Sequence, residues 1–253
     1  MQNGFFEFNG GKIYFEVEGE GIPVTFLHGF SLDHRMWKSQ VEFLKDKYKI
    51  ITYDLRGFGK SSVPTGEYSH HEDLKALLGF LKIKKTNLVG LSLGGEVGVD
   101  FVLSYPDMVT NLILVDSSLG GFNSTVDWNV HPELGLEKAK ENWLNHIVFA
   151  KTKENKFAST QLKEILNDYS EWHWYNSDPR KKSDPSALEQ IQNIKIPTNI
   201  IIGENDLSYY HDIANLLNEK IEGSNKIIVQ NSGHMVNLES PEEFNKILLE
   251  KFK

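Results

Sequence analysis

The sequence predicts an α/β fold in which helices cover both faces of an eight-stranded, mostly parallel sheet, with a helical segment inserted as a cap. Three observations favour this fold. Five short runs rich in Val, Ile and Leu are bounded by turn residues, as expected for strands buried on both faces. Segments with helical periodicity alternate with these runs, which is typical of a parallel sheet. Residues 119–190 interrupt this alternation and carry two longer helical patterns.

The predicted strands follow from these patterns in chain order. Residues 5–8 and 12–19 fit a hairpin that turns at Asn9-Gly10-Gly11, and a third strand follows at 23–28. The five apolar runs are 49–54, 87–92, 111–116, 198–204 and 225–230.

Helical periodicity appears between the later strands, near 35–46, 70–82, 93–105, 208–219 and 240–252. The last helix has the clearest start, because Ser240 provides a cap residue, Pro241 occupies the first position and Glu243 the third. The two cap patterns lie around 133–151 and 158–176. We therefore predict a core domain of residues 1–118 and 187–253 and a helical cap of residues 119–186.

Composition excludes several classes of function. The chain of 253 residues has a formal charge of −8, which disfavours nucleic acid and anionic membranes as partners. It has no cysteine, so disulfides and thiolate metal sites are excluded. It shows no signal peptide and no apolar run of membrane-spanning length, so we expect a cytoplasmic protein. Histidine spacing predicts no metal, and the glycine pattern predicts no nucleotide cofactor.

Ser92 is the candidate nucleophile. It lies in Gly90-Leu91-Ser92-Leu93-Gly94, between an apolar strand and a helix, which is the context of a G-x-S-x-G elbow. A tight turn there exposes the serine hydroxyl in strained backbone geometry. Side chains at positions 90 and 94 would collide with the neighbouring strand or helix, so glycine is expected at both.

Two backbone N–H groups are candidates for an oxyanion hole. The strand ending at His28-Gly29 leads into a loop that can direct the N–H of Phe30 toward the N–H of Leu93. His28 itself is interpreted as a side chain that orients this loop. His34 is interpreted as a solvated residue at a helix start.

The base that would activate a serine must be a histidine, and His234 is the candidate. It follows the last apolar strand, on the edge of the sheet where Ser92 also lies. Asp206 is the favoured acid because it follows another strand at that edge, and Asp116 is the alternative. Glu204 and Asp212 are less favoured acids.

Aromatic residues concentrate in the cap, which holds four of the five tryptophans. An insertion over the ends of parallel strands roofs the ligand crevice. We therefore predict that Trp128, Trp143, Trp172 and Trp174 bind the substrate. His173 is a further candidate for a substrate contact.

Taken in order, Ser92, Asp206 and His234 resemble the triad of the α/β-hydrolase fold superfamily. "FLHGF", "YDLRGFGKSS", "GENDLSYY" and "SGHMVNLESPEEF" resemble the segments that carry its oxyanion loop, its fourth-strand connection, its acid and its histidine. The likeness covers nearly the whole chain and extends to small capped serine esterases and 3-oxoadipate enol-lactonases.

The resemblance implies acyl transfer to water on a small-molecule ester, with a lactone or a carbon–carbon bond as alternative substrates. An anionic lactone would require a cationic group, for which Arg35, Arg56 and Arg180 are available, although the first two are expected to brace loops. A non-catalytic small-molecule receptor on the same fold is the alternative from a different class. Homodimer formation stays open.

Overall fold

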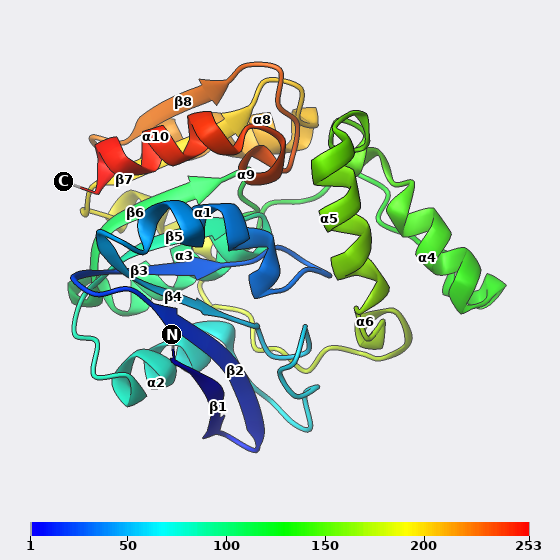
Figure 1. Ribbon diagram of the computed structural model, residues 1–253, viewed down its shortest axis with the longest axis horizontal. Coiled ribbons are helices and arrows are strands. Elements are labelled where there is room, and N and C mark those ends of the chain that lie inside the picture. The colour runs from blue at the N-terminus through cyan, green and yellow to red at the C-terminus, as the bar shows by residue number, and fades with distance from the viewer. Residues whose placement is uncertain (1, 253) are drawn as a thin grey trace.

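The computed structural model describes residues 2–252 and contains an eight-stranded sheet with the strand order β1-β2-β4-β3-β5-β6-β7-β8 (Figure 1). The β1–β2 and β2–β4 pairs are antiparallel, and every later pair is parallel. The predicted eight-stranded, mostly parallel sheet is therefore confirmed. The strands are β1 (Gln2–Phe8), β2 (Gly11–Glu18), β3 (Ile22–Leu27), β4 (Tyr48–Tyr53), β5 (Thr86–Leu91), β6 (Val109–Val115), β7 (Thr198–Gly203) and β8 (Asn225–Val229).

The first two strands form the predicted hairpin. Phe8 pairs with Gly11, so Asn9 and Gly10 alone form the turn. Both adopt positive φ angles, 46° and 71°, as a two-residue turn that matches strand twist requires.

Two inner strands of the sheet are fully buried, whereas β8 at its edge is partly exposed. Every residue of β5 and β7 is buried, as the continuous apolar runs predict. The β8 strand differs, because Ile228 keeps 44% of its surface exposed. The prediction that all five runs are buried on both faces is wrong for β8, which forms the edge of the sheet and is less completely covered.

Helices cover both faces of the sheet (Figure 1). On one face α1 contacts α10, and on the other α2 contacts α3, which packs on β5 and β6. The α10 helix begins at Pro241 as predicted, but the Ser240 hydroxyl bonds Ser232 Oγ at 2.7 Å instead of capping the helix. These helices are α1 (Lys38–Leu44), α2 (His70–Phe80), α3 (Leu93–Ser104), α8 (Ser208–Lys220), α9 (Val236–Glu239) and α10 (Pro241–Lys251).

Between β6 and β7 the chain leaves the sheet and forms α4 (Leu136–Leu144), α5 (Lys156–Asn167), α6 (Trp172–Tyr175) and α7 (Ala187–Gln190). We call residues 119–186 the cap. Its helices are shorter than predicted. The Asn155 side chain accepts the N–H groups of Phe157 and Ala158 and so starts α5, while Glu171 takes a left-handed φ of 54° before α6.

The cap lies beyond the carboxyl ends of the parallel strands, where their arrowheads point in Figure 1. Several hydrogen bonds and ion pairs fasten the cap to the rest of the molecule, among them the following three. Arg35 Nη1 bonds Asp168 Oδ2 at 2.7 Å, and the Trp143 indole N–H donates to Ser31 Oγ at 2.7 Å. The third joins Thr152 to Glu239 at 2.6 Å. Within residues 2–252 no helix combines the length and apolarity needed to cross a bilayer.

Candidate active site

Ser92 occupies a strained turn between β5 and α3. Its backbone angles are φ 53° and ψ −116°, in a region that residues with side chains rarely adopt. The turn depends on its flanking glycines. A Cβ on Gly90 would overlap the carbonyl of Gly94 in the helix, and a Cβ on Gly94 would overlap the carbonyl of Leu27 in β3. The steric reason predicted for both glycines is confirmed.

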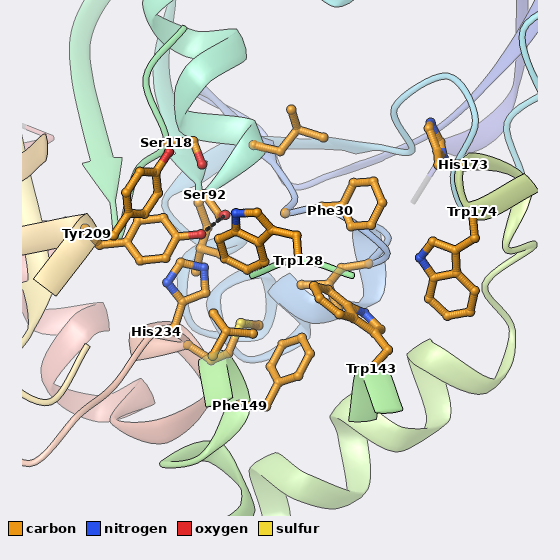
Figure 2. Close-up of a pocket in the computed structure, with 17 residues that line it drawn as sticks. Phe30, Ser92, Ser118, Trp128, Trp143, Phe149, His173, Trp174, Tyr209 and His234 are labelled. Atoms are coloured by element: carbon orange, nitrogen blue, oxygen red, sulfur yellow. Dashed lines mark hydrogen bonds between the residues drawn. The ribbon is translucent and has the colours of Figure 1, made fainter. Parts of the chain in front are cut away.

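Ser92 lines a cavity of about 370 Å³ under the cap (Figure 2). The walls are mostly apolar and aromatic, and His234 lines the same space. The remaining lining residues are Gly29, Phe30, Leu32, Leu91, Leu93, Ser118, Trp128, Trp143, Val148, Phe149, His173, Trp174, Tyr209, Tyr210 and Met235.

His234 and Asp206 form a hydrogen-bonded pair. Nδ1 of His234 lies 2.9 Å from Oδ2 of Asp206, and Oδ1 of the same carboxylate accepts the N–H of Leu207 at 2.7 Å. This leaves Nε2 of His234 as the nitrogen available for proton transfer.

The Ser92 hydroxyl bonds to a tyrosine rather than to the imidazole. Its oxygen lies 3.4 Å from the Tyr210 hydroxyl, and the dashed line in Figure 2 marks this bond. Within the described chain Ser92 and His234 share no hydrogen bond. The Tyr210 ring nevertheless lies against the imidazole, with centroids 4.1 Å apart, so all three groups meet at one wall of the cavity.

The alternative acid, Asp116, lies beside Asp206. One carboxylate oxygen of Asp116, one of Asp206 and a ring nitrogen of His234 all lie within 4.8 Å of one another. Asp116 is fully buried, and its Oδ1 accepts the N–H of Gly203 at 2.8 Å. Burial, together with the charge of Asp206, raises the pKa of Asp116 well above its ordinary value. Of the two acids, Asp206 forms the bond to the imidazole.

The proposed oxyanion donors border the same cavity. Phe30 and Leu93 both line it, and in residues 2–252 neither backbone N–H donates to another group of the protein. Leu93 is the first residue of α3, where helical N–H groups have no intrahelical acceptor. His28 has the predicted structural position, because it is buried and its Nε2 accepts the N–H of Leu55 at 2.9 Å.

Comparison with known proteins identifies this architecture. Residues 26–247 match the alpha/beta hydrolase family. The chain belongs to that family. It is 26% identical to 3-oxoadipate enol-lactonase 2 of Acinetobacter baylyi over 88% of this chain and 85% of the relative. The resemblance to the enol-lactonase group is confirmed.

Two further relatives widen the comparison. The hydrolase is 28% identical to a 2-hydroxy-6-oxononadienedioate/2-hydroxy-6-oxononatrienedioate hydrolase of Paraburkholderia phymatum, over 94% of this chain and 90% of the relative. Among solved structures it superposes on Est816, described as an N-acyl homoserine lactone degrading enzyme, with a TM-score of 0.79 and 25% identity. That match covers 98% of this chain and 99% of the other.

The structure corrects two of the sequence interpretations of this hydrolase. Trp128, Trp143 and Trp174 line the cavity, but Trp172 does not. The α6 helix is a single turn, and Trp172 packs edge-to-face on His173 with centroids 5.0 Å apart. The prediction that Trp172 lines the site is therefore wrong.

His34 is not solvated, contrary to expectation. Its side chain is 7% exposed, and its Nδ1 lies 2.7 Å from Oδ1 of Asp54. On the other side of the ring, Nε2 lies 3.3 Å from Oε1 of Glu16. Burial opposes the charged imidazole, but the hydrogen bond and charge of Asp54 prevail and raise the pKa of His34.

Sequence reasoning missed two tyrosines that the hydrolase places at the site. Tyr209 and Tyr210 lie in the first turn of α8, directly after the loop that contains Asp206, and both line the cavity. The motif "DLSYY" held the signal, because a helix that starts after an edge loop directs its first turn toward the same edge. Burial raises the pKa of Tyr210, so its phenol stays protonated and can donate.

The arginines considered as anion receptors are engaged elsewhere. Arg35 Nη2 pairs with Asp33 at 2.6 Å, Arg56 Nη2 with Asp73 at 2.7 Å and Arg180 Nη2 with Glu96 at 3.2 Å. The loop-bracing interpretation of the first two is confirmed. None of the three is among the described residues that line the cavity.

His173 lines the cavity as a neutral ring. Burial lowers its pKa to about 4, and its Nδ1 lies 2.9 Å from the Tyr169 hydroxyl. The imidazole also stacks on Phe58 with centroids 4.4 Å apart. His173 therefore contributes an aromatic surface to the site and no positive charge at neutral pH.

Two described clusters have ligand atoms close enough for a metal ion: Asp33, His34 and Asp54, and Asp116, Asp206 and His234. In both, the histidine Nδ1 is already bonded to an aspartate. The bond to the aspartate thus occupies one ring nitrogen of each histidine.

Proposed function

We propose that this protein is a serine hydrolase that cleaves small carboxylic esters through an acyl-enzyme. One observation carries the proposal. A serine on a strained strand-to-helix turn faces the same aromatic cavity as a histidine whose Nδ1 is bonded to an aspartate. That arrangement suits nucleophilic attack with general-base assistance.

In the first step, Ser92 Oγ attacks the ester carbonyl while Nε2 of His234 takes the hydroxyl proton. Asp206 stabilises the imidazolium that forms, because its carboxylate accepts the Nδ1 proton. For this step Ser92 rotates about its Cα–Cβ bond and exchanges the 3.4 Å bond with Tyr210 for one with His234. Catalytic hydrogen bonds are often long or poorly aligned in unliganded sites and tighten when substrate binds.

The carbonyl oxygen becomes an oxyanion, which the N–H groups of Phe30 and Leu93 bind. The tetrahedral intermediate then collapses, and the alkoxide leaves with the proton from His234. Water attacks the acyl-enzyme in the second half-reaction and gives its proton to His234. The carboxylic acid leaves, and Ser92 recovers its proton.

The walls of the cavity support an uncharged acyl group as the substrate. The side chains from the cap are aromatic or apolar, and His173 is neutral. An ionised carboxylate placed among them would lose its hydration without gaining a cationic partner. The esterase is therefore favoured over an enol-lactonase whose substrate carries a carboxylate, whereas an uncharged lactone would fit the same site.

The test compares two p-nitrophenyl esters of equal chain length, the pentanoate and the monoester of glutaric acid, before and after treatment with phenylmethylsulfonyl fluoride. We expect inhibitor-sensitive hydrolysis of the pentanoate and at least 10-fold lower kcat/KM for the glutarate. Absent or inhibitor-resistant hydrolysis would contradict the serine mechanism. Equal rates on both esters would contradict only the preference for uncharged acyl groups.

The same measurement addresses the receptor alternative. A receptor on this fold would bind a small molecule and turn it over at most once or very slowly. Linear release of p-nitrophenol over hundreds of equivalents of enzyme is the result expected of an esterase. A burst of one equivalent followed by no further release would favour the receptor.

A further inference from the structure

Glu239 holds the backbone on both sides of His234. Its Oε2 accepts the N–H of Gly233, and its Oε1 accepts the N–H of Met235 at 3.3 Å. The side chain of His234 is held independently by Asp206. Fixing the two flanking residues restricts the direction in which the imidazole can leave the backbone, and catalysis is sensitive to such placement.

The same carboxylate reaches the cap. Oε1 of Glu239 accepts the hydroxyl of Thr152 at 2.6 Å, and Thr152 is fully buried. The Glu239 carbonyl also accepts the Asn155 amide at 3.4 Å. We call residues 230–235, between β8 and α9, the histidine loop. Two donors from this loop and one from the cap thus converge on the carboxylate of Glu239.

Gly233 allows the cap to come this close. A Cβ at this position would overlap the Cβ of Lys151, the residue before Thr152. The histidine loop and cap residues 151–155 are therefore in direct contact. Burial raises the pKa of Glu239 despite its hydrogen bonds from Thr152, Gly233 and Met235.

We propose that Glu239 is a positioning residue that couples docking of the cap to the orientation of His234. The inference rests on the proposed function, because it assigns His234 the role of base. When Thr152 is docked, the carboxylate has its full set of donors and keeps the loop in place. When the cap moves away, Glu239 loses its cap donor and the loop gains freedom.

The test uses Thr152→Val, which removes the hydroxyl and retains the shape of the side chain. The matched control is Thr160→Val, because the Thr160 hydroxyl bonds only the Lys156 carbonyl within α5. Neither residue lines the cavity. We expect kcat to fall about 3- to 10-fold for Thr152→Val with KM within 2-fold of wild type, and to stay unchanged for Thr160→Val.

Glu239→Gln is the stronger variant, because an amide keeps one acceptor oxygen for the three donors. We expect a fall in kcat of about 10- to 100-fold, again with little change in KM. Hydrogen–deuterium exchange gives a readout that does not need activity. The peptide containing Gly233 and Met235 should exchange faster in both Glu239→Gln and Thr152→Val than in Thr160→Val.

These readouts separate the two proposals. If the wild type hydrolyses no ester but the exchange differences appear, the esterase proposal fails and the coupling of cap and loop stands. If Thr152→Val matches Thr160→Val in both kcat and exchange, the coupling is wrong even in an active esterase. Should Glu239→Gln fail to fold, the two threonine variants decide alone.

Discussion

This hydrolase contains two hydrogen-bonded histidine–aspartate pairs of similar geometry, which differ in whether the histidine is placed for proton transfer. His34 and Asp54 approach to 2.7 Å, and His234 and Asp206 to 2.9 Å. The difference lies at the second ring nitrogen. Nε2 of His34 faces the carboxylate of Glu16 at 3.3 Å, whereas His234 opens onto the cavity that Ser92 shares.

This comparison shows that a hydrogen-bonded histidine and aspartate do not by themselves make a catalytic base. A base needs one nitrogen oriented by an acid and the other free to meet a substrate proton. With acids on both sides, His34 instead links β2, the loop after β4 and the turn before α1. Variants of the His234–Asp206 pair should therefore change kcat, whereas variants of the His34–Asp54 pair should change the free energy of unfolding.

The largest effect is expected for Ser92→Ala, which removes the proposed nucleophile that the His234–Asp206 pair would activate. We expect ester turnover to fall by about 10⁴-fold or more. The thermal melt should change little, because the exposed face of the side chain borders a cavity. A fall in turnover accompanied by collapse of the melt would assign Ser92 to packing instead.

Asp206→Asn is expected to lower kcat by about 10⁴-fold, since an amide would favour the wrong imidazole tautomer. Asp116→Asn is the control, because Asp116 bonds the backbone of Gly203 and Asp206 contacts the imidazole. The control should retain most of the turnover. Reversal of these two results would identify Asp116 as the working acid.

Asp54→Asn tests the pair of His34 and Asp54, which has a second acid, Glu16, on the other side of the ring. Asp54 accepts the backbone N–H groups of His34 and Lys60 as well as the His34 ring. Leaving a buried charged partner unpaired costs about 3 kcal/mol or more, so the unfolding midpoint in urea should fall clearly. The kcat of the remaining folded protein should stay near that of wild type. Loss of kcat without loss of stability would mean that this pair participates in catalysis.

The smallest effect concerns pH. The folded-state pKa of His34 is raised, so its contribution to stability is complete below the unfolded value of about 6.5 and disappears as pH rises through the folded value. The His34→Gln variant should therefore lose more unfolding free energy at pH 5.5 than at pH 9, measured by urea denaturation. An equal loss at both values would contradict a charged His34.

The contribution of Asp54 to stability has the opposite dependence on pH. Burial opposes its ionisation, but the hydrogen bond and charge of His34 prevail and lower its pKa. Its contribution is present above the unfolded value of about 3.9 and is lost as pH falls further. The pair therefore stabilises the fold chiefly between the unfolded pKa of the acid and the folded pKa of the histidine.

The sequence was sufficient where short-range chemistry decides the structure. Apolar runs identified the parallel strands, and steric crowding explained the glycines around Ser92. Asp206 and His234 could be paired because both follow strands that end at one edge of the sheet. Their catalytic roles stay proposals that the variants above test.

The sequence was insufficient where distant segments determine an environment. His34 is buried by Glu16 from β2 and Asp54 from the end of β4, which no local pattern reveals. Trp172 failed as a cavity residue because a one-turn helix points its successive side chains in different directions. The partners of Glu239 likewise come from the cap and the histidine loop, which lie far apart along the chain.

The distribution of tryptophan has an optical consequence. Four of the five indoles belong to the cap, and the fifth, Trp37, is wholly enclosed against Phe26 and Phe244. Trp143 donates to Ser31, whose own hydroxyl donates to the carbonyl of Phe30 at 2.6 Å. Tryptophan fluorescence of the unlabelled protein is thus weighted toward the cap. A molecule that binds in the cavity beneath the cap should therefore change this fluorescence.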